Sequence, residues 1–331
     1  MPLRLAAAVL ASVSTLLALG ATGGSSGVSA TPTLAFVSGL TGSLALTESG
    51  LVQRPLLMTR GVSEFAWSPD GRKIAFTGVG GVIRVVNADG SGLHALSART
   101  ILDDLDWSPD SRRLVYTGLV GRTGVGIYVV SASGGTPRRL APSVPASVLP
   151  TWSVDDVIAF GSARTDRAHV YSVHSDGTGL RILAHHATDA FPSWSPDGRS
   201  LLFQREDCSH TPCGTALTVV RRDGSGRRRV ALVPRYGTGP LQATWSPDGR
   251  RIAFARLRDK DFGRDVFVVD ADGHNVRNLT GNVAEGERPA WSPDGRLIAF
   301  QSSGSIYLMN ADGSDKRRFV QDAGRPAWRP R

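Results

Sequence analysis

Residues 291 to 300, Trp291-Ser292-Pro293-Asp294-Gly295-Arg296-Leu297-Ile298-Ala299-Phe300, decide the fold of this chain. They place an apolar entry, a tight turn and a second apolar run next to one another. The proline presets φ at the second turn position, and the glycine is free to take a positive φ, so the stretch predicts a β-hairpin. The same Trp-Ser-Pro-Asp-Gly motif recurs in copies that begin at Trp67, Trp194 and Trp245. A repeat therefore organises the chain.

Every Trp of the chain belongs to this repeat. The intervals between them run from 37 residues (Trp291 to Trp328) to 51 residues (Trp194 to Trp245), which brackets the ~40 to 45 residues of a four-stranded propeller blade. Each unit reads as a Trp strand, an apolar second strand, a third strand that ends in an Asp-Gly turn, and a shorter polar strand. The seven positions are Trp67, Trp107, Trp152, Trp194, Trp245, Trp291 and Trp328.

The two ends of the chain complete the count of blades. Residues 34–36, 43–46 and 51–58 look like the second, third and fourth strands of a unit without its own Trp strand, whereas residues 325–328 form a Trp strand with no unit after it. If both ends share one blade, the ring closes and no sheet edge is left open. The sequence therefore predicts an all-β fold, a seven-bladed β-propeller over residues 31–331.

The repeated W-S-P-D-G-R-x-I-A-F, followed by I-Y-x-M-N-A-D-G, resembles the propeller repeat of the TolB family, a WD40-like unit. The resemblance covers roughly residues 34–331 and is confined to the propeller. The α/β domain that precedes the propeller in TolB has no counterpart here, and TolB is usually described with six blades. The resemblance thus implies the blade type and leaves a role in a Tol-like system open.

Residues 1–30 predict a signal peptide. An uncharged run from Leu5 to Leu19 follows Arg4, and a small-residue stretch then ends at Val28-Ser29-Ala30, the pattern of a cleavage site. The apolar run is shorter than the roughly 20 residues of a spanning helix, so no stable membrane anchor is expected. We expect an exported protein, periplasmic or extracellular.

Cys208 and Cys213 are the only cysteines. In an oxidising compartment a disulfide across this short loop is the favoured interpretation. A metal site made of the two cysteines and His210 is the alternative, but no fourth ligand lies nearby in the sequence. We therefore predict a disulfide and no metal.

Acidic residues recur just before the Trp strands, where the loops of a propeller meet at one mouth of the channel. An acidic mouth would bind a cation or a basic partner segment, whereas solvated loops are the alternative explanation. His185 and His186 with Asp189 form the only local histidine group, which leaves a metal or proton-transfer site conceivable. The candidate binding residues are Glu64, Asp103, Asp104, His185, His186, Asp189, Glu285 and Glu287.

The chain lacks strong signals for catalysis or for nucleic acid. Its only G-x-S-x-G match, residues 23–27, falls in the signal region, and no phosphate-binding G-x-x-x-x-G-K motif is present. The net charge of +9 comes almost wholly from Arg without interleaved aromatic residues, which is weak evidence for nucleic acid. We expect a monomeric, non-catalytic scaffold without a cofactor, whose inter-blade loops bind a protein, a cell-envelope component or a small ligand. The alternative is a propeller-type enzyme, a polysaccharide lyase or hydrolase with or without a metal, whose site lies at the channel mouth.

Overall fold

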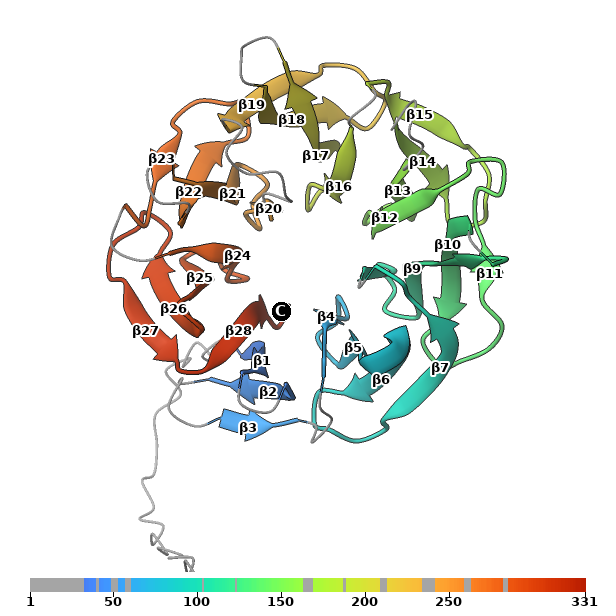
Figure 1. Cartoon of the computed structure of the whole chain (residues 1–331), viewed down its shortest axis with the longest axis horizontal. Coiled ribbons are helices and arrows are strands. Elements are labelled where there is room, and N and C mark those ends of the chain that lie inside the picture. Colours follow the sequence, from blue (N-terminus) through green and yellow to red (C-terminus); the bar gives the residue numbers. More distant parts are fainter. Residues whose placement is uncertain are drawn as a thin grey trace, which may run out of the picture. The chain divides into compact units, whose positions relative to one another are not determined.

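Strands account for nearly all regular structure in the chain. The computed structural model describes residues 33–39, 42–48, 53–56, 61–102, 104–122, 124–162, 169–186, 189–208, 213–233, 242–258, 263–281 and 285–331. The predicted signal peptide lies outside these residues. Pro32–Arg331 is one compact unit, in which seven antiparallel sheets of four strands follow one another around a ring (Figure 1).

The innermost strand of every blade ends at a Trp residue, and in six of the blades the chain then passes outward through a second, a third and a fourth strand. The innermost strands are β4 (Glu64–Trp67), β8 (Leu105–Trp107), β12 (Ser147–Trp152), β16 (Ala190–Trp194), β20 (Thr244–Trp245), β24 (Glu287–Trp291) and β28 (Ala323–Trp328). The second strands are β5 (Lys73–Thr77), β9 (Arg113–Val120), β13 (Val157–Ser162), β17 (Ser200–Asp207), β21 (Arg251–Leu257), β25 (Leu297–Ser302) and β1 (Leu34–Ser38).

In six of the seven blades the fourth strand is shorter than the third, as the sequence predicted, and in the blade of β6 and β7 both have six residues. The third strands are β6 (Val82–Asn87), β10 (Gly124–Ser131), β14 (Val170–His174), β18 (Gly214–Arg221), β22 (Arg264–Asp270), β26 (Ser305–Asn310) and β2 (Leu44–Thr47). The fourth strands are β7 (His94–Arg99), β11 (Arg138–Arg139), β15 (Arg181–Ala184), β19 (Arg228–Val233), β23 (Arg277–Asn278), β27 (Arg317–Val320) and β3 (Gln53–Pro55). A single 3-10 turn, η1 (Val79–Gly81), is the only helix within the described ranges, and nothing there is long and apolar enough to cross a membrane.

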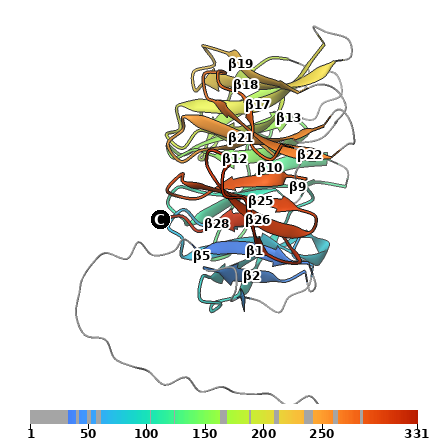
Figure 2. The same cartoon turned by 90° about the vertical axis from the view of Figure 1, so that its left-hand side faces the viewer.

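Both ends of the chain build the seventh blade. β28 pairs with β1 in antiparallel fashion, with Leu34 opposite Trp328, so the last strand of the chain supplies the innermost position of a sheet begun by the first (Figure 2). This arrangement confirms the predicted seven-bladed, all-β ring.

Each of the seven interfaces between neighbouring blades holds its own hydrophobic cluster with one Trp in it. In four blades the indole N–H also donates to a main-chain carbonyl on the innermost strand of the preceding blade, as in the 3.0 Å bond from Trp107 Nε1 to Ala66 O. The Trp residues therefore fasten blade to blade, because apolar burial and a directed hydrogen bond act across the same interface.

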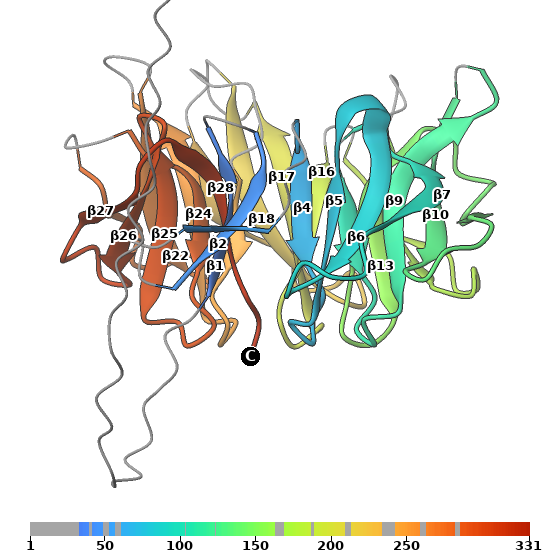
Figure 3. The same ribbon diagram turned by 90° about the horizontal axis from the view of Figure 1, so that it is seen from below.

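The Ser-Pro-Asp-Gly turns join the first and second strands with the same bonds in each copy. In the last copy Ser292 Oγ donates to Asp294 Oδ1 at 2.6 Å and accepts the Leu297 N–H at 2.9 Å, while Gly295 takes a φ of 69°. The carboxylate is thus engaged inside its turn. We call the face that carries these turns the turn face; it is the lower face in Figure 3, on the side of the C-terminus.

Candidate functional site

One residue from each blade lies at the start of the innermost strand, three positions before the Trp. Five of these residues line a cavity of about 360 Å³ enclosed by β4, β8, β12, β16 and β20. The other two each bond to one of the five. We call the set the mouth ring, and the face on which it lies the mouth face; in blade order the ring consists of Glu64, Asp104, Leu149, Phe191, Gln242, Arg288 and Arg325.

The backbone of the mouth ring is unusual. Five of its seven residues have φ between 48° and 55° although none is glycine, namely Leu149, Phe191, Gln242, Arg288 and Arg325. In β12, β16, β24 and β28 the pairing with the second strand shifts register at this point, so the residue belongs to a β-bulge. A bulge re-aims a side chain, and a left-handed bulky residue costs on the order of 1 to 3 kcal/mol. Strain held in several blades is typical of a site that depends on where those side chains point.

The acidic arc of the ring, Glu64 and Asp104, continues into the partly buried Asp106. Asp104 accepts the main-chain N–H of Leu149 at 3.0 Å, and Asp106 accepts that of Trp152 at 2.8 Å, so both carboxylates tie β8 to β12 of the next blade. Burial raises the pKa of Asp104 and of Asp106 above the usual range, although these hydrogen bonds oppose the shift. A carboxylate that lines the cavity therefore binds a proton more readily than a surface aspartate does.

The apolar arc of the ring follows in the next two blades. Leu149 and Phe191 line the cavity together with Pro150 and Pro192, which stand directly after them and are buried. Phe191 is 38% exposed, and among the exposed large apolar residues that the structure describes it is the only aromatic one. An exposed aromatic group on a concave wall is typical of a binding surface.

The basic arc lies in the last two blades. Arg325 forms an ion pair with Glu64, and Arg264 Nε lies 3.6 Å from Glu287 Oε1. Arg288 donates its main-chain N–H to Gln242 Oε1 at 2.8 Å, but its guanidinium has no partner among the described residues. Burial and the nearby Arg325 guanidinium lower the pKa of Arg288, while the neighbouring glutamates oppose that shift.

The acidic residues predicted from the sequence fall into different environments. Glu64 and Asp104 line the central cavity, and Glu287 stands next to the ring. Asp189 is 0% exposed and receives both Nε and Nη2 of Arg205, at 2.6 and 2.7 Å, which gives it a buried structural role. Glu285 is exposed. Asp103 lies outside the described residues.

The two candidate histidines do not line the central cavity. His185 and His186 are exposed, and the main-chain N–H of His186 bonds to Asp189 Oδ2 at 2.9 Å. The His185 ring lies 6.1 Å from the ring of His169. His186 instead borders a second cavity of about 500 Å³ beside Arg205 and Arg229. Within the described residues, the histidines and the mouth ring are thus two separate places.

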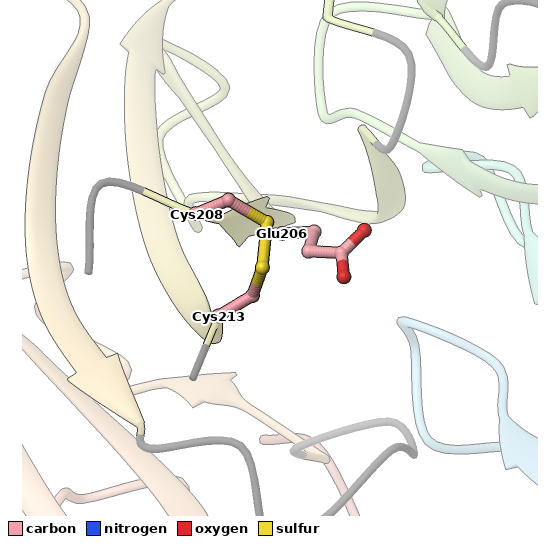
Figure 4. A group of neighbouring side chains, drawn as sticks. All are labelled: Glu206, Cys208 and Cys213. Atoms are coloured by element: carbon pink, nitrogen blue, oxygen red, sulfur yellow. A yellow bond between two sulfur atoms is a disulfide. The ribbon is translucent and has the colours of Figure 1, made fainter. Parts of the chain in front are cut away.

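The predicted disulfide is present. Cys208 and Cys213 are joined at the start and end of the loop between β17 and β18, with 2.11 Å between the sulfur atoms (Figure 4). Potential ligand atoms of Glu206 and both cysteines lie within 4.8 Å of one another. The sulfur atoms are bonded to each other, however, so they are not available as thiolate ligands. His210, the third residue of the metal alternative, lies outside the described residues.

Most of the ring was not predicted from the sequence, because the candidates were chosen for their acidic side chains. Only Glu64 and Asp104 were among them, and the equivalent residues of the other blades were not. The available signal was the position itself, three residues before each Trp, which a proline follows in four blades.

Comparison with known proteins gives the family and the fold. A family model described as TolB beta propeller domain matches residues 59–237. An uncharacterized protein of Agrobacterium fabrum is 27% identical over 165 residues, which are 46% of this chain and 52% of that protein. The chain therefore spans about half the length of this curated relative.

Two solved structures illustrate the range of proteins that share the fold. A putative TolB from Agrobacterium tumefaciens has 23% identity and a TM-score of 0.55, over 75% of this chain and 87% of that one. An oligogalacturonate lyase from Vibrio parahaemolyticus has 12% identity and a TM-score of 0.67, over 81% of this chain and 83% of that one. At these identities the likeness concerns the fold alone.

Proposed function

We propose that this chain, which belongs to the TolB β-propeller family, is an exported, non-catalytic scaffold that binds a partner through the mouth ring and the loops around it. The carrying observation is the central cavity, whose wall bears a different side chain from each of five blades on an otherwise repeated frame. A rigid scaffold with variable residues at one opening is a common design for recognition. The partner classes are a protein, a cell-envelope component or a small ligand.

Export is part of this proposal and rests on residues 1–30 and on the disulfide. Disulfides persist in oxidising compartments, which agrees with a periplasmic or extracellular location. N-terminal sequencing of the protein recovered from producing cells should find cleavage after Ala30. A mature protein that still begins at Met1 would contradict export through this signal.

The binding role is tested by placing a photo-reactive phenylalanine analogue at position 191 of the full chain. Irradiation in envelope extract should give a cross-linked partner, because the side chain at this position lines the cavity. The matched control is the same analogue at Leu180, which is equally exposed at 38% but lies on the turn face between β14 and β15. Equal capture from both positions, or from neither, would contradict binding at the mouth.

The acidic candidates next to the ring give a second test. Charge reversal of Glu285 and Glu287 should weaken capture if the partner reaches the loop that leads into β24. Unchanged capture would remove these two residues from the proposed surface and leave the cavity wall as the site.

A propeller-type enzyme is the second candidate, and the raised pKa of Asp104 in the cavity wall favours it. The fold is shared with an oligogalacturonate lyase, so oligogalacturonate is the first substrate to try. Product formation that Asp104→Asn abolishes would support an enzyme. His186→Ala tests the alternative site at the second cavity, and no activity in the wild-type protein would leave the binding role alone.

A further inference from the structure

We infer that the mouth ring selects a ligand that carries a carboxylate on an apolar body, with the carboxylate bound by Arg288 and the apolar group placed against Phe191 and Leu149. This inference rests on the proposed function, and it names the chemistry of the ligand.

Arg288 carries the anion-binding part of the inference. Three guanidinium groups meet in the basic arc, and two of them face carboxylates: Arg325 pairs with Glu64, and Arg264 lies near Glu287. The third, Arg288, is partly buried and makes no side-chain hydrogen bond or ion pair with a residue that the structure describes, although Glu64 and Glu287 attract its charge. A guanidinium is a planar fork that matches a carboxylate with two parallel hydrogen bonds. A bound carboxylate would supply the partner that the fold does not.

Electrostatics supports the same assignment. Burial and the charge of Arg325 lower the pKa of Arg288 although Glu64 and Glu287 oppose the shift, so the surroundings as a whole disfavour its positive charge. An anion beside the guanidinium would reverse that effect. On the other side of the ring, the cluster of Asp104 and Asp106 repels an anion, so the ligand has one favoured orientation.

Gln242 connects the basic arc to the apolar arc. Its Oε1 accepts the main-chain N–H of Arg288, and this bond fixes which end of the amide is oxygen. The Nε2 group then has no partner within the described ranges, while Gln242 itself lines the cavity. It offers a second donor to the ligand between Arg288 and Phe191.

The apolar arc and the cavity volume limit the size of the ligand. Leu149 and Phe191 are held in left-handed backbone that directs them at a bulge, with buried prolines behind them. A cavity of about 360 Å³ is near the lower end of the roughly 300 to 1,000 Å³ of ligand sites, and it admits one aromatic or aliphatic group. Arg288 does not line this cavity, so the carboxylate would extend from it past Gln242, whose side chain bonds to the Arg288 main chain. The C-terminal residue of a partner protein and a free aromatic carboxylate both have this chemistry.

Calorimetric titration of the full chain with acetyl-Ala-Ala-Phe tests the inference. The free-acid peptide should bind, and its C-terminal amide should bind at least about tenfold more weakly, since a charge-assisted bond is lost. This comparison uses the wild-type protein and does not depend on a variant that folds. Equal affinity for acid and amide, or no binding of either, would overturn the inference.

Variants locate the carboxylate. Arg288→Gln should weaken binding of the acid by about tenfold and leave the amide nearly unchanged, because only the acid has lost its charged partner. Arg318→Gln, an exposed change on β27, is the matched control and should alter neither. If Arg288→Gln affects acid and amide equally, the carboxylate is not bound by Arg288.

A second probe distinguishes the sources of the ligand. If 3-phenylpropanoate binds as well as the peptide, a small aromatic carboxylate is sufficient, whereas binding of the peptide alone indicates a protein C-terminus. Cross-linking from position 191 separates the two levels of the proposal. A partner still captured in the Arg288→Gln background with full yield would sink the carboxylate inference and keep the binding role.

Discussion

The turn face and the mouth face are made by the two ends of the same seven innermost strands, yet their chemistry is opposite in kind. On the turn face, Ser68, Ser195, Ser246 and Ser292 each donate to the aspartate two positions later at 2.6 Å, so one solution is copied around the ring. At the mouth, the residue three positions before each Trp changes from acidic to apolar to basic. Repetition serves closure of the ring, and the departure from repetition lies at the proposed binding site.

The largest effect is expected at a Trp that joins two neighbouring blades. Trp107→Ala should lower the free energy of unfolding by about 3 to 5 kcal/mol, because it empties an interface between blades and removes the bond to Ala66 O. Urea unfolding measures the loss, and Trp107→Phe should retain a large part of the stability. A loss below about 1.5 kcal/mol for the alanine variant would mean that the blades hold together without their Trp contacts.

A smaller and uniform effect is expected on the turn face. Ser292→Ala removes an acceptor from the Leu297 N–H and a donor from Asp294, at a cost of about 1 to 2 kcal/mol. Ser195→Ala should cost the same to within about 0.5 kcal/mol, since its bonds are the same. Widely different costs in urea unfolding would show that the copied turns are not energetically equivalent.

At the mouth, the backbone itself should reveal the strain. With a φ of 55° at position 191, Phe191→Gly should be more stable than Phe191→Ala by about 0.5 to 1 kcal/mol. Ile182 is a matched control, because it is similarly exposed at 39% but lies in β15 without a positive φ. There the order should reverse, with the glycine variant less stable than the alanine variant. The same order at both positions would contradict a strained mouth.

The smallest effect is a difference in the pH dependence of the two faces. Burial raises the pKa of Asp104 above its ordinary 3.8, so its contribution to stability is present below about pH 4 and is lost as the pH rises through the raised pKa. Asp312 in an outer turn has a lowered pKa, because Ser314 and its main-chain N–H bond to the carboxylate. Its contribution is present above about pH 4 and is lost as the pH falls.

Two variants separate these contributions. Asp104→Asn should flatten the decline of the unfolding free energy between about pH 4 and pH 7, whereas Asp312→Asn should flatten its decline below about pH 4. The slopes of urea-unfolding free energy against pH are the measurement. Identical slopes in the wild type and in Asp104→Asn would show that this carboxyl does not titrate differently on folding.

The Trp repeat was sufficient to predict the ring, because blade number, strand order and closure all depend on local patterns that recur. The disulfide was equally accessible from the short spacing of Cys208 and Cys213. The site was not, since its residues share a position rather than a chemical type, and a search for carboxylates found only Glu64 and Asp104 of the seven. Partners distant in the chain also escaped prediction: nothing in the loop that holds Asp189 shows that Arg205, on the following strand, neutralises it.

The pairing of β28 with β1 has a consequence for the order of assembly. β28 follows every other strand of the ring in the sequence, so the inner edge of β1 stays unpaired during synthesis until residues 323–328 have been made. The other six blades have all four of their strands before that point, but the ring is not yet closed. Loss of residues 323–331 would therefore remove an innermost strand rather than a strand at the rim. Such a truncation would open the ring of blades instead of disordering only its outer edge.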